Sequence, residues 1–382
     1  MTPASAAPLI AVCANQAWNL VNFRAGLIAG LHDRGFRVHA LAPPDPEMER
    51  RLRDMGCGFT PIALDAAGLA PHRDIATFLG LRRIIADLKP VAWLSWTIKP
   101  NVYGSLAAGM AGVPAFPNVS GLGTAFIRRN LLTLVAKQLY RTGFRRAPTV
   151  FFQNLDDRAE FVDGGLVSPV QARVLPGSGI DAQAWAPPPG GRPTPRRFLM
   201  LSRVVADKGV REYVAAAREV RQTWPDARFA LMGEVGVANR TAIAQGELQG
   251  WIDEGVIEHH PPVSDVRPHI AAADFVVLPS YREGLSRVLL EAAAMGRPIV
   301  TTNVPGCRDI VRDQENGFLC EPQDAASLAE ALNRACACDD RVWQQLGTTG
   351  RARVIAEFSQ ERVTALYLEA LAAAGVIPPQ GA

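Results

Sequence analysis

Short hydrophobic runs alternate along the chain with longer stretches in which apolar residues recur every three or four positions. The runs are typical of strands buried on both faces, and the longer stretches are typical of helices that cover a sheet. In the first half, strands are predicted at LIAVCAN, FRVHALAP, VAWLSW, VFFQN and ARVLPGSG, with helices over 23–34 and 47–55. This alternation predicts an α/β domain with a mostly parallel sheet.

The same alternation begins again after residue 186. Strands are predicted at RFLMLSR, RFALMGE, IEHHPP, DFVVLPS, RPIVTTN and GFLCEP, with helices between them, one over 210–223. The intervening APPPGGRPTPRR is rich in proline and glycine and is interpreted as a linker. We therefore expect two Rossmann-like βαβ domains, 1–186 and 187–382, that face each other across a cleft. The last helix, about 360–374, either caps the second domain or crosses back to the first.

Composition agrees with two well-filled cores, because 48% of the 382 residues are hydrophobic. Six scattered cysteines are interpreted as reduced thiols of a cytoplasmic protein. The N-terminus has no lysine or arginine before its short apolar run, and no uncharged apolar run reaches the length of a spanning helix. A soluble or peripherally attached protein is expected.

The net charge of +3 is unevenly distributed. Residues 88–155 contain no carboxylate, although they contain eight lysines and arginines, and such a region indicates an anionic partner. Within it, residues 124–146 mix six cations with apolar side chains, as in a helix that lies in a membrane interface. The candidate membrane contacts are Arg128, Arg129, Lys137 and Arg141. The alternative is a buried helix with an exposed basic rim.

Two loops of the second half contain the candidate chemistry. SRVVADKGV places Arg203 and Lys208 at a strand-to-helix turn, with Gly209 at the expected helix start. Two cations beside a helix N-terminus can bind a diphosphate, although a solvated surface loop has the same composition. The chain has no P-loop motif and no G-x-G-x-x-G after its first strand, which argues against a P-loop ATPase and an NAD dehydrogenase.

The second loop, YREGLSRVLLEAAAMG, carries two glutamates eight residues apart, Glu283 and Glu291. Gly284 permits close backbone approach, and Ser286 is the expected N-cap of the following helix. A diphosphate would repel Glu283, so we expect this carboxylate to contact hydroxyls of an attached sugar and Glu291 to contact a ribose. The alternative is an ordinary exposed acid followed by a helix-surface residue.

With these motifs in place, nearly the whole chain resembles the retaining glycosyltransferases of the GT-B fold, specifically glycosyltransferase family 4. The resemblance implies that Glu283 and Glu291 form the E-x7-E motif that binds the donor's sugar and ribose, and that Arg203 and Lys208 bind its diphosphate. LMGE, GRPIVTTNVPGCRDIV and NGFL are further matches. The implied donor contacts are Glu291, Gly284, Leu285, Ser286 and Gly233.

A narrower resemblance rests on NLVNFRAGLIAGL, WTIKPNVYGSLAAGMAGVP, VSGLGTAF and GCRD. These segments are similar to the subgroup that acts on undecaprenyl-diphosphate-linked sugars, which includes N-acetylgalactosaminyltransferases. The sequence departs from the family at ANQAWNLVNFR, which has no Gly-Gly turn, and at Ser120, where many members have histidine. The implied acceptor contacts are Asn19, Arg24, Lys99, Ser120, Gly121 and Gly123.

The resemblance implies transfer of a hexose or N-acetylhexosamine, with retention, from a UDP-sugar to a polyprenyl-diphosphate-linked sugar in bacterial glycan, capsule or exopolysaccharide assembly. No Asp-x-Asp or His/Cys cluster suggests a metal, so cations and helix N–H groups would neutralise the leaving diphosphate. We expect no cofactor and no nucleic acid partner, and we expect peripheral attachment to the inner face of the cytoplasmic membrane. The alternatives are a UDP-sugar 2-epimerase-like enzyme and a non-catalytic sugar-nucleotide-binding subunit.

Overall fold

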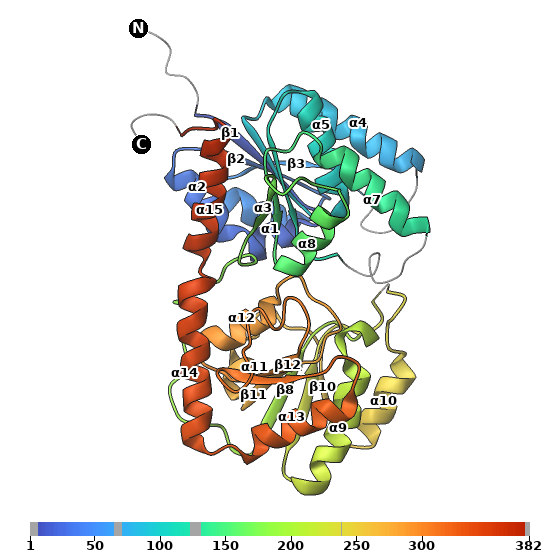
Figure 1. Cartoon of the computed structure of the whole chain (residues 1–382), viewed down its shortest axis with the longest axis vertical. Coiled ribbons are helices and arrows are strands. Elements are labelled where there is room, and N and C mark those ends of the chain that lie inside the picture. The colour runs from blue at the N-terminus through green and yellow to red at the C-terminus, as the bar shows by residue number, and fades with distance from the viewer. Residues whose placement is uncertain (1–6, 65–70, 123–130, 238, 379–382) are drawn as a thin grey trace. The chain divides into compact units, whose positions relative to one another are not determined.

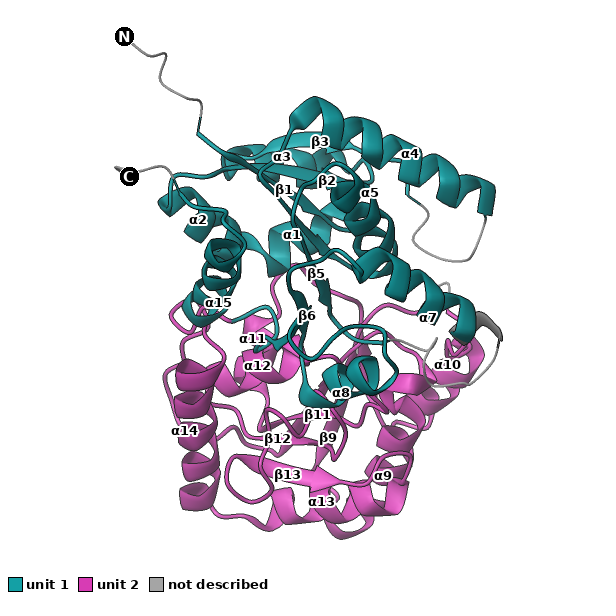
Figure 2. Ribbon diagram, turned by 45° about the horizontal axis from the view of Figure 1, so that its top comes forward, with its two compact units in different colours: residues 1–179, 360–382 teal, residues 180–359 magenta. Residues whose placement is uncertain are grey.

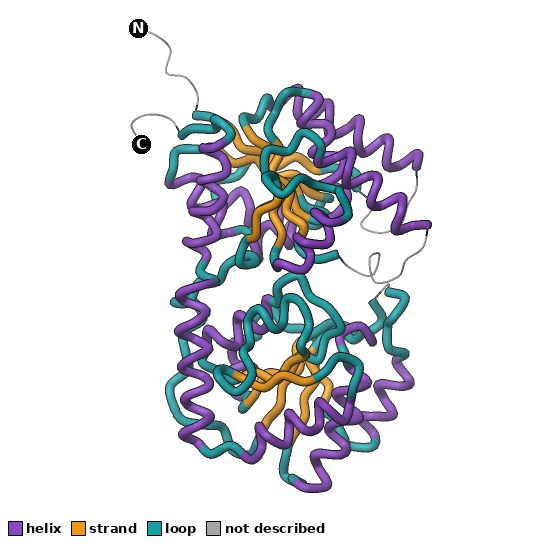
Figure 3. Tube along the Cα trace, viewed as in Figure 1, coloured by secondary structure: helices purple, strands orange, loops and turns teal. Residues whose placement is uncertain are grey.

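The computed structural model describes residues 7–64, 71–122, 131–237 and 239–378. The chain divides into two compact units (Figure 2), and unit 1 comprises Met1–Gly179 together with Gln360–Ala382. Unit 2 is Ile180–Ser359. In each unit a parallel sheet lies between helices (Figure 3), which confirms the predicted α/β class.

Unit 1 contains a seven-stranded sheet of order β3-β2-β1-β4-β5-β6-β7. Its strands are β1 (Leu9–Cys13), β2 (Arg37–Ala42), β3 (Gly58–Pro61), β4 (Ala92–Trp96), β5 (Ala115–Val119), β6 (Val150–Phe152) and β7 (Ala172–Val174). Its α-helices are α1 (Ala17–Phe23), α2 (Ala25–Asp33), α3 (Pro46–Asp54), α4 (Pro71–Leu88), α5 (Ser105–Met110), α7 (Leu131–Phe144), α8 (Leu155–Asp163) and α15 (Gln360–Ala373). A π-helical turn, Pro100–Gly104, precedes α5.

The C-terminal helix α15 completes the core of unit 1, which decides the alternative that the sequence left open (Figure 1). Its Tyr367 is fully buried, and the Tyr367 hydroxyl accepts a hydrogen bond from Asn118 Nδ2 at 2.9 Å. A Cβ on Gly30 of α2 would overlap the Thr364 side chain of α15. The two helices therefore approach closely because position 30 has no side chain.

Unit 2 contains a six-stranded sheet of order β10-β9-β8-β11-β12-β13. Its strands are β8 (Arg197–Leu201), β9 (Arg228–Met232), β10 (Glu258–His260), β11 (Phe275–Leu278), β12 (Ile299–Thr302) and β13 (Gly317–Cys320). Its α-helices are α9 (Val210–Thr223), α10 (Gln245–Asp253), α11 (Arg267–Ala272), α12 (Arg287–Ala294), α13 (Ala325–Ala337) and α14 (Asp340–Glu357). A single 3-10 turn, Ala206–Lys208, precedes α9.

The proline-rich segment that was predicted to be a linker belongs to unit 2. Arg192 within it is buried, and its Nε donates to Asp274 Oδ1 at 2.8 Å while Nη1 donates to the Cys338 carbonyl at 2.6 Å. The boundary between the units lies earlier, at Ile180, whose N–H donates to the Phe358 carbonyl at 2.9 Å. Composition could not predict that the proline-rich segment is anchored in unit 2, because Asp274, the carboxylate that binds Arg192, is 82 residues away in the sequence.

Two predicted helices differ from the observed ones. The predicted helix 23–34 begins only at Ala25, as α2, because Arg24, with φ of −124°, separates it from α1, which ends at Phe23. The predicted membrane helix 124–146 corresponds to α7, Leu131–Phe144, and Arg128 and Arg129 lie outside the described residues. Tyr140 and Phe144 of α7 are buried in the core of unit 1, so these two side chains do not face solvent or a lipid surface. No helix in the described ranges is long and apolar enough to span a bilayer.

We predict that Gly30→Ala destabilises the protein by about 1–3 kcal/mol, because the added methyl group overlaps Thr364 in a packed interface. The double variant with Thr364→Ala should regain most of the lost stability. The matched control is Gly80→Ala in α4, where a Cβ meets nothing within 4 Å, and which should be neutral or stabilising by about 0.5–1 kcal/mol. Differential scanning calorimetry measures the stability of all three variants. Equal stabilities of Gly30→Ala and Gly80→Ala would contradict the packing of α15 on α2.

Candidate active site

The loops that follow β8 and β11 pack backbone against backbone at the carboxyl edge of the unit 2 sheet. Gly209, with φ of +77°, begins α9, and a Cβ there would overlap the Pro279 carbonyl. The Tyr281 N–H donates to the Asp207 carbonyl at 3.0 Å, which joins the two loops directly. Ligands of parallel α/β sheets bind at this edge.

The loops after β9 and β12 pack in the same way. A Cβ on Gly233, which follows β9, would overlap the Ser202 carbonyl. Gly306, with φ of +78°, lies against the 283–284 peptide, and a Cβ there would be 2.6 Å from the Gly284 carbonyl oxygen. The Gly306 N–H donates to Asp309 Oδ2 at 2.7 Å. The loops after β8, β9, β11 and β12 are thus held in fixed positions relative to one another. Gly233 and Gly284 both belong to this packed backbone.

This packing brings Lys208 and Glu283 into an ion pair between Nζ and Oε1, although they lie 75 residues apart in the sequence. Both side chains are mostly buried, with 22% and 14% of their surface exposed. Arg203, on the same loop as Lys208, is exposed and forms no ion pair with the residues that the structure describes. Among the described residues, Arg203 is therefore a cation without an ion pair, on the same loop as Lys208, which already has a carboxylate partner.

Glu291 is buried in α12, not on the helix surface. Its Oε1 accepts from Arg287 Nε at 2.8 Å, and burial raises the pKa of Glu291, although the Arg287 guanidinium acts in the opposite direction. Ser286 is the N-cap of α12 as predicted, and its side chain accepts from the Leu289 N–H at 3.5 Å. Leu285 packs against the buried cluster on this face of the sheet. Arg287 was not predicted, although its spacing of four residues from Glu291 is typical of a helical ion pair.

In unit 1, the predicted acceptor contacts follow β1, β4 and β5. Arg24 is only 3% exposed, and its guanidinium lies 4.7 Å from the centre of the Trp96 ring, so the structure places it in the core. Asn19 lies on α1, and its Oδ1 is buried without a described hydrogen-bond partner. Ser120 and Gly121, which has φ of +132°, follow β5 directly. Gly123 lies outside the described residues.

Lys99 forms a buried ion pair with Asp74, at 2.8 Å between Nζ and Oδ1. Asp74 was not predicted because it precedes the stretch without carboxylates in the sequence. It also accepts from Tyr103, whose pKa is raised to about 12 by burial and by this carboxylate. The charge of Lys99 is therefore matched inside unit 1, which reduces the excess of positive charge inferred from the sequence.

The arrangement in unit 2 is suited to binding an anion beside a polyhydroxylated group. Guanidinium and ammonium groups bind phosphate oxygens, and carboxylates accept hydrogen bonds from hydroxyl groups. Within the described chain, no three His, Cys, Asp or Glu side chains are grouped as metal ligands would be.

We predict that Gly209→Ala destabilises unit 2 by about 2–5 kcal/mol. A left-handed φ costs about 1–2 kcal/mol for alanine, and the overlap with Pro279 adds about 1–3 kcal/mol. Gly255→Ala is the matched control, because Gly255 has φ of +71° and open space around its Cβ position. Its stability should fall only by the about 1–2 kcal/mol that a left-handed φ costs for alanine. If the two variants unfold at the same temperature in calorimetry, the close packing of these loops is ruled out.

Two glycosyltransferase domain families match this chain. The glycosyl transferase 4-like domain matches residues 22–178, and the glycosyl transferases group 1 domain matches residues 195–337. The chain is 27% identical over 332 residues to N,N'-diacetylbacillosaminyl-diphospho-undecaprenol alpha-1,3-N-acetylgalactosaminyltransferase of Campylobacter jejuni, covering 82% of this chain and 86% of that protein. It is 23% identical over 323 residues to UDP-Gal:alpha-D-GlcNAc-diphosphoundecaprenol alpha-1,3-galactosyltransferase of Escherichia coli, covering 78% and 80%.

Solved structures share the fold. HepE of Anabaena in complex with UDP superposes with a TM-score of 0.78 at 17% identity, covering 96% of this chain and 100% of that one. Sucrose-phosphate synthase of Thermosynechococcus elongatus superposes with a TM-score of 0.75 at 18% identity, with the same coverage. The domain matches, the two parallel sheets and these structural neighbours agree, and the chain is a glycosyltransferase of the GT-B fold, built from a glycosyl transferase 4-like domain and a glycosyl transferases group 1 domain.

Proposed function

We propose that this glycosyltransferase moves a hexose or N-acetylhexosamine from a UDP-sugar to a polyprenyl-diphosphate-linked sugar, with retention of anomeric configuration. The observation that carries the proposal is the set of charges at the carboxyl edge of the unit 2 sheet: Arg203 and Lys208 after β8, Glu283 on the loop after β11, and Glu291 in α12. The Campylobacter and Escherichia relatives, both named for diphosphoundecaprenol-linked substrates, support this class of acceptor.

Arg203 and Lys208 are the proposed diphosphate contacts. A bound diphosphate would compete with Glu283 for Lys208, because both anions favour the same ammonium group. Lys208 would then neutralise the charge that develops on the leaving diphosphate, and Glu283 would be released to accept hydrogen bonds from the donor sugar. Glu291 is the proposed ribose contact, positioned by Arg287.

We predict that Glu283→Gln binds UDP more tightly than the parent protein but transfers sugar at least 100-fold more slowly. The neutral amide competes for the Lys208 ammonium group more weakly than the carboxylate does, so Lys208 is more available to the diphosphate, whereas the proposed sugar contact is weakened in the transition state. Lys208→Gln should weaken UDP binding and also lower turnover by at least 100-fold, which corresponds to about 2.7 kcal/mol. Calorimetric titration with UDP and the steady-state transfer rate test both parts.

The matched control is Glu247→Gln, which breaks the exposed ion pair between Arg211 and Glu247 in the same unit and should change neither quantity. GDP and ADP serve as nucleotide controls, and the assay should be run with and without EDTA. NMR of the product reports the anomeric configuration. Conversion of the UDP-sugar without an acceptor would favour the epimerase-like alternative, and nucleotide binding without turnover would favour the non-catalytic subunit.

Exposed side chains on neighbouring helices of unit 1 support attachment to an anionic membrane. Helices α4 and α7 both contact α5 (Figures 1 and 2), and these helices carry exposed apolar residues. The apolar residues are Ile75, Leu79, Met110, Leu134 and Val135. The cations are Arg82 and Arg83 of α4, the partly exposed Lys137 of α7, and Arg145, which follows α7 directly. Arg141 is also exposed, but its Nε donates to the Gly165 carbonyl at 3.0 Å, so it is partly engaged within the unit.

We predict that the joint change of Arg82, Arg83, Lys137 and Arg145 to Gln weakens binding to anionic vesicles at least tenfold. Each cation near such a surface contributes about 1 kcal/mol, and molar salt should release the parent protein because the Debye length falls to about 3 Å. The matched control changes four exposed cations of unit 2, Arg228, Arg240, Arg312 and Arg341, to Gln.

Activity on two acceptors separates attachment from catalysis. The unit 1 variant should lose activity on a long-chain polyprenyl acceptor in vesicles while keeping it on a short, water-soluble diphosphate analogue. Two outcomes would contradict membrane attachment: equal losses of activity on the two acceptors, or equal co-sedimentation of the two four-residue variants with vesicles. Either would mean that α7 only packs on the unit 1 sheet.

A further inference from the structure

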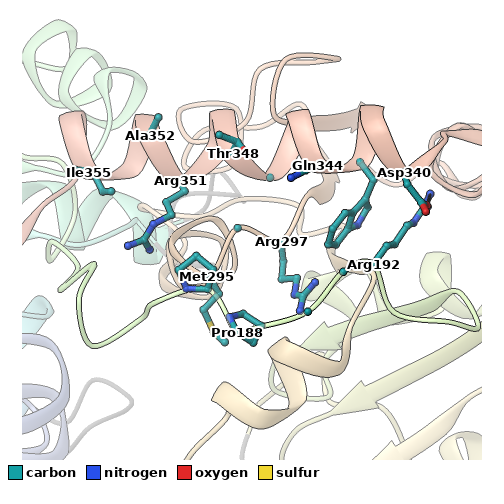
Figure 4. A pocket seen from close by; sticks show the side chains of 16 residues that line it. Pro188, Arg192, Met295, Arg297, Asp340, Gln344, Thr348, Arg351, Ala352 and Ile355 are labelled. Atoms are coloured by element: carbon teal, nitrogen blue, oxygen red, sulfur yellow. Dashed lines mark ion pairs between the residues drawn. The ribbon is translucent and has the colours of Figure 1, made fainter.

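A cavity of about 490 Å³ lies in unit 2 away from the loops described above (Figure 4). The proline-rich segment 187–192 forms one side, α14 forms the other, and Met295–Arg297 lie at its base. Neither Lys208 nor Glu283 lines it. Its volume falls within the range of small-molecule sites, roughly 300–1,000 Å³.

The lining is positively charged. Arg192, Arg297 and Arg351 follow one another along the cavity beneath α14 (Figure 4), and Asp340 is the one acidic residue among the lining side chains. The Asp340 side chain is 83% exposed, so water screens its charge. Buried Asp274, which does not line the cavity, balances the charge of Arg192, so the excess of positive charge lies on Arg297 and Arg351.

Arg297 provides an unused hydrogen-bond donor. The residue is 5% exposed, and its guanidinium lies 5.3 Å from the centre of the Trp343 ring. Nη2 donates to the Ala271 carbonyl at 2.6 Å, but Nε is buried and donates to no acceptor among the described residues. A buried donor without a partner is destabilising, and more so when the group is charged. An anion in the cavity would balance the positive charge of this buried guanidinium group.

The other two arginines have their partners within the protein. Arg192 binds Asp274 and the Cys338 carbonyl, and Arg351 donates to the carbonyls of Trp185 and Ala182, both at 3.1 Å. These contacts fix the two guanidinium groups at either end of the cavity. Arg351 adds positive potential, Arg192 is balanced by Asp274, and Arg297 supplies the direct hydrogen bond.

We propose that this cavity binds a small organic anion, a phosphate monoester or a carboxylate on a compact apolar body, with an anionic oxygen on the guanidinium group of Arg297. A guanidinium group binds either anion through its planar N–H groups. The apolar body would contact the remaining lining, which includes Pro187, Pro188, Met295 and Ile355. The proposal does not depend on the function proposed above, because it uses none of the same residues.

Calorimetric titration of the full chain tests the proposal at constant ionic strength. Phenyl phosphate and benzoate probe the two anions, phenol probes the apolar body alone, and inorganic phosphate probes the charge alone. We expect phenyl phosphate or benzoate to bind at least tenfold more tightly than phenol or inorganic phosphate. Binding that is strongest for inorganic phosphate, or absent for all four, would overturn the proposal.

Two kinds of variant locate the site. Arg297→Met removes the donor, and Thr348→Trp fills the cavity from an exposed position on α14 without changing the core. Both should weaken binding at least tenfold, whereas Gln345→Trp, at an exposed position of α14 that does not line the cavity, should not. Arg203→Gln should also keep the binding. If Arg203→Gln abolishes it, or Thr348→Trp leaves it unchanged, the anion binds elsewhere and the proposal is wrong.

Discussion

Direct packing of backbone against backbone sets the geometry of the candidate active site. Gly209 rests on the Pro279 carbonyl, Gly233 on the Ser202 carbonyl, and Gly306 on the peptide between Glu283 and Gly284. Because no side chain intervenes at these three contacts, the loops cannot shift by a rotamer change. The charged side chains that project from them are therefore held on a rigid base, as sites that depend on orientation require.

Apart from Arg203, the proposed donor-binding charges on this base already have partners inside the protein. Lys208 is paired with Glu283, and Glu291 with Arg287. A partly buried ion without a partner would be costly, and each ion pair avoids that cost. Under the proposed function, binding of an anionic ligand exchanges one partner of Lys208 for another, so the free energy gained on binding is a difference between two ionic contacts.

The sequence predicted most strands of both sheets, the helix at 210–223 and the N-cap Ser286, because these depend on local hydrophobic patterns and local capping chemistry. The ion pair of Lys99 with Asp74, and the anchoring of Arg192 by Asp274, join distant segments whose partners no local pattern identifies. The burial of Arg24 over Trp96 is of the same kind, since an arginine is usually exposed to solvent. Charge counted along the sequence therefore overstates the positive charge that unit 1 presents to a ligand.

The position of α15 in unit 1 has a consequence for the order in which the chain folds during its synthesis. Unit 1 begins with the first residues of the chain but needs Tyr367, near the last, to cover Asn118 and its neighbours. At about 5–20 residues per second, a ribosome needs roughly 10–40 s to make the residues of unit 2 that separate the two parts. During that interval the surface of α2 around Gly30 remains uncovered, so the second unit to be synthesised is the first that can complete its core.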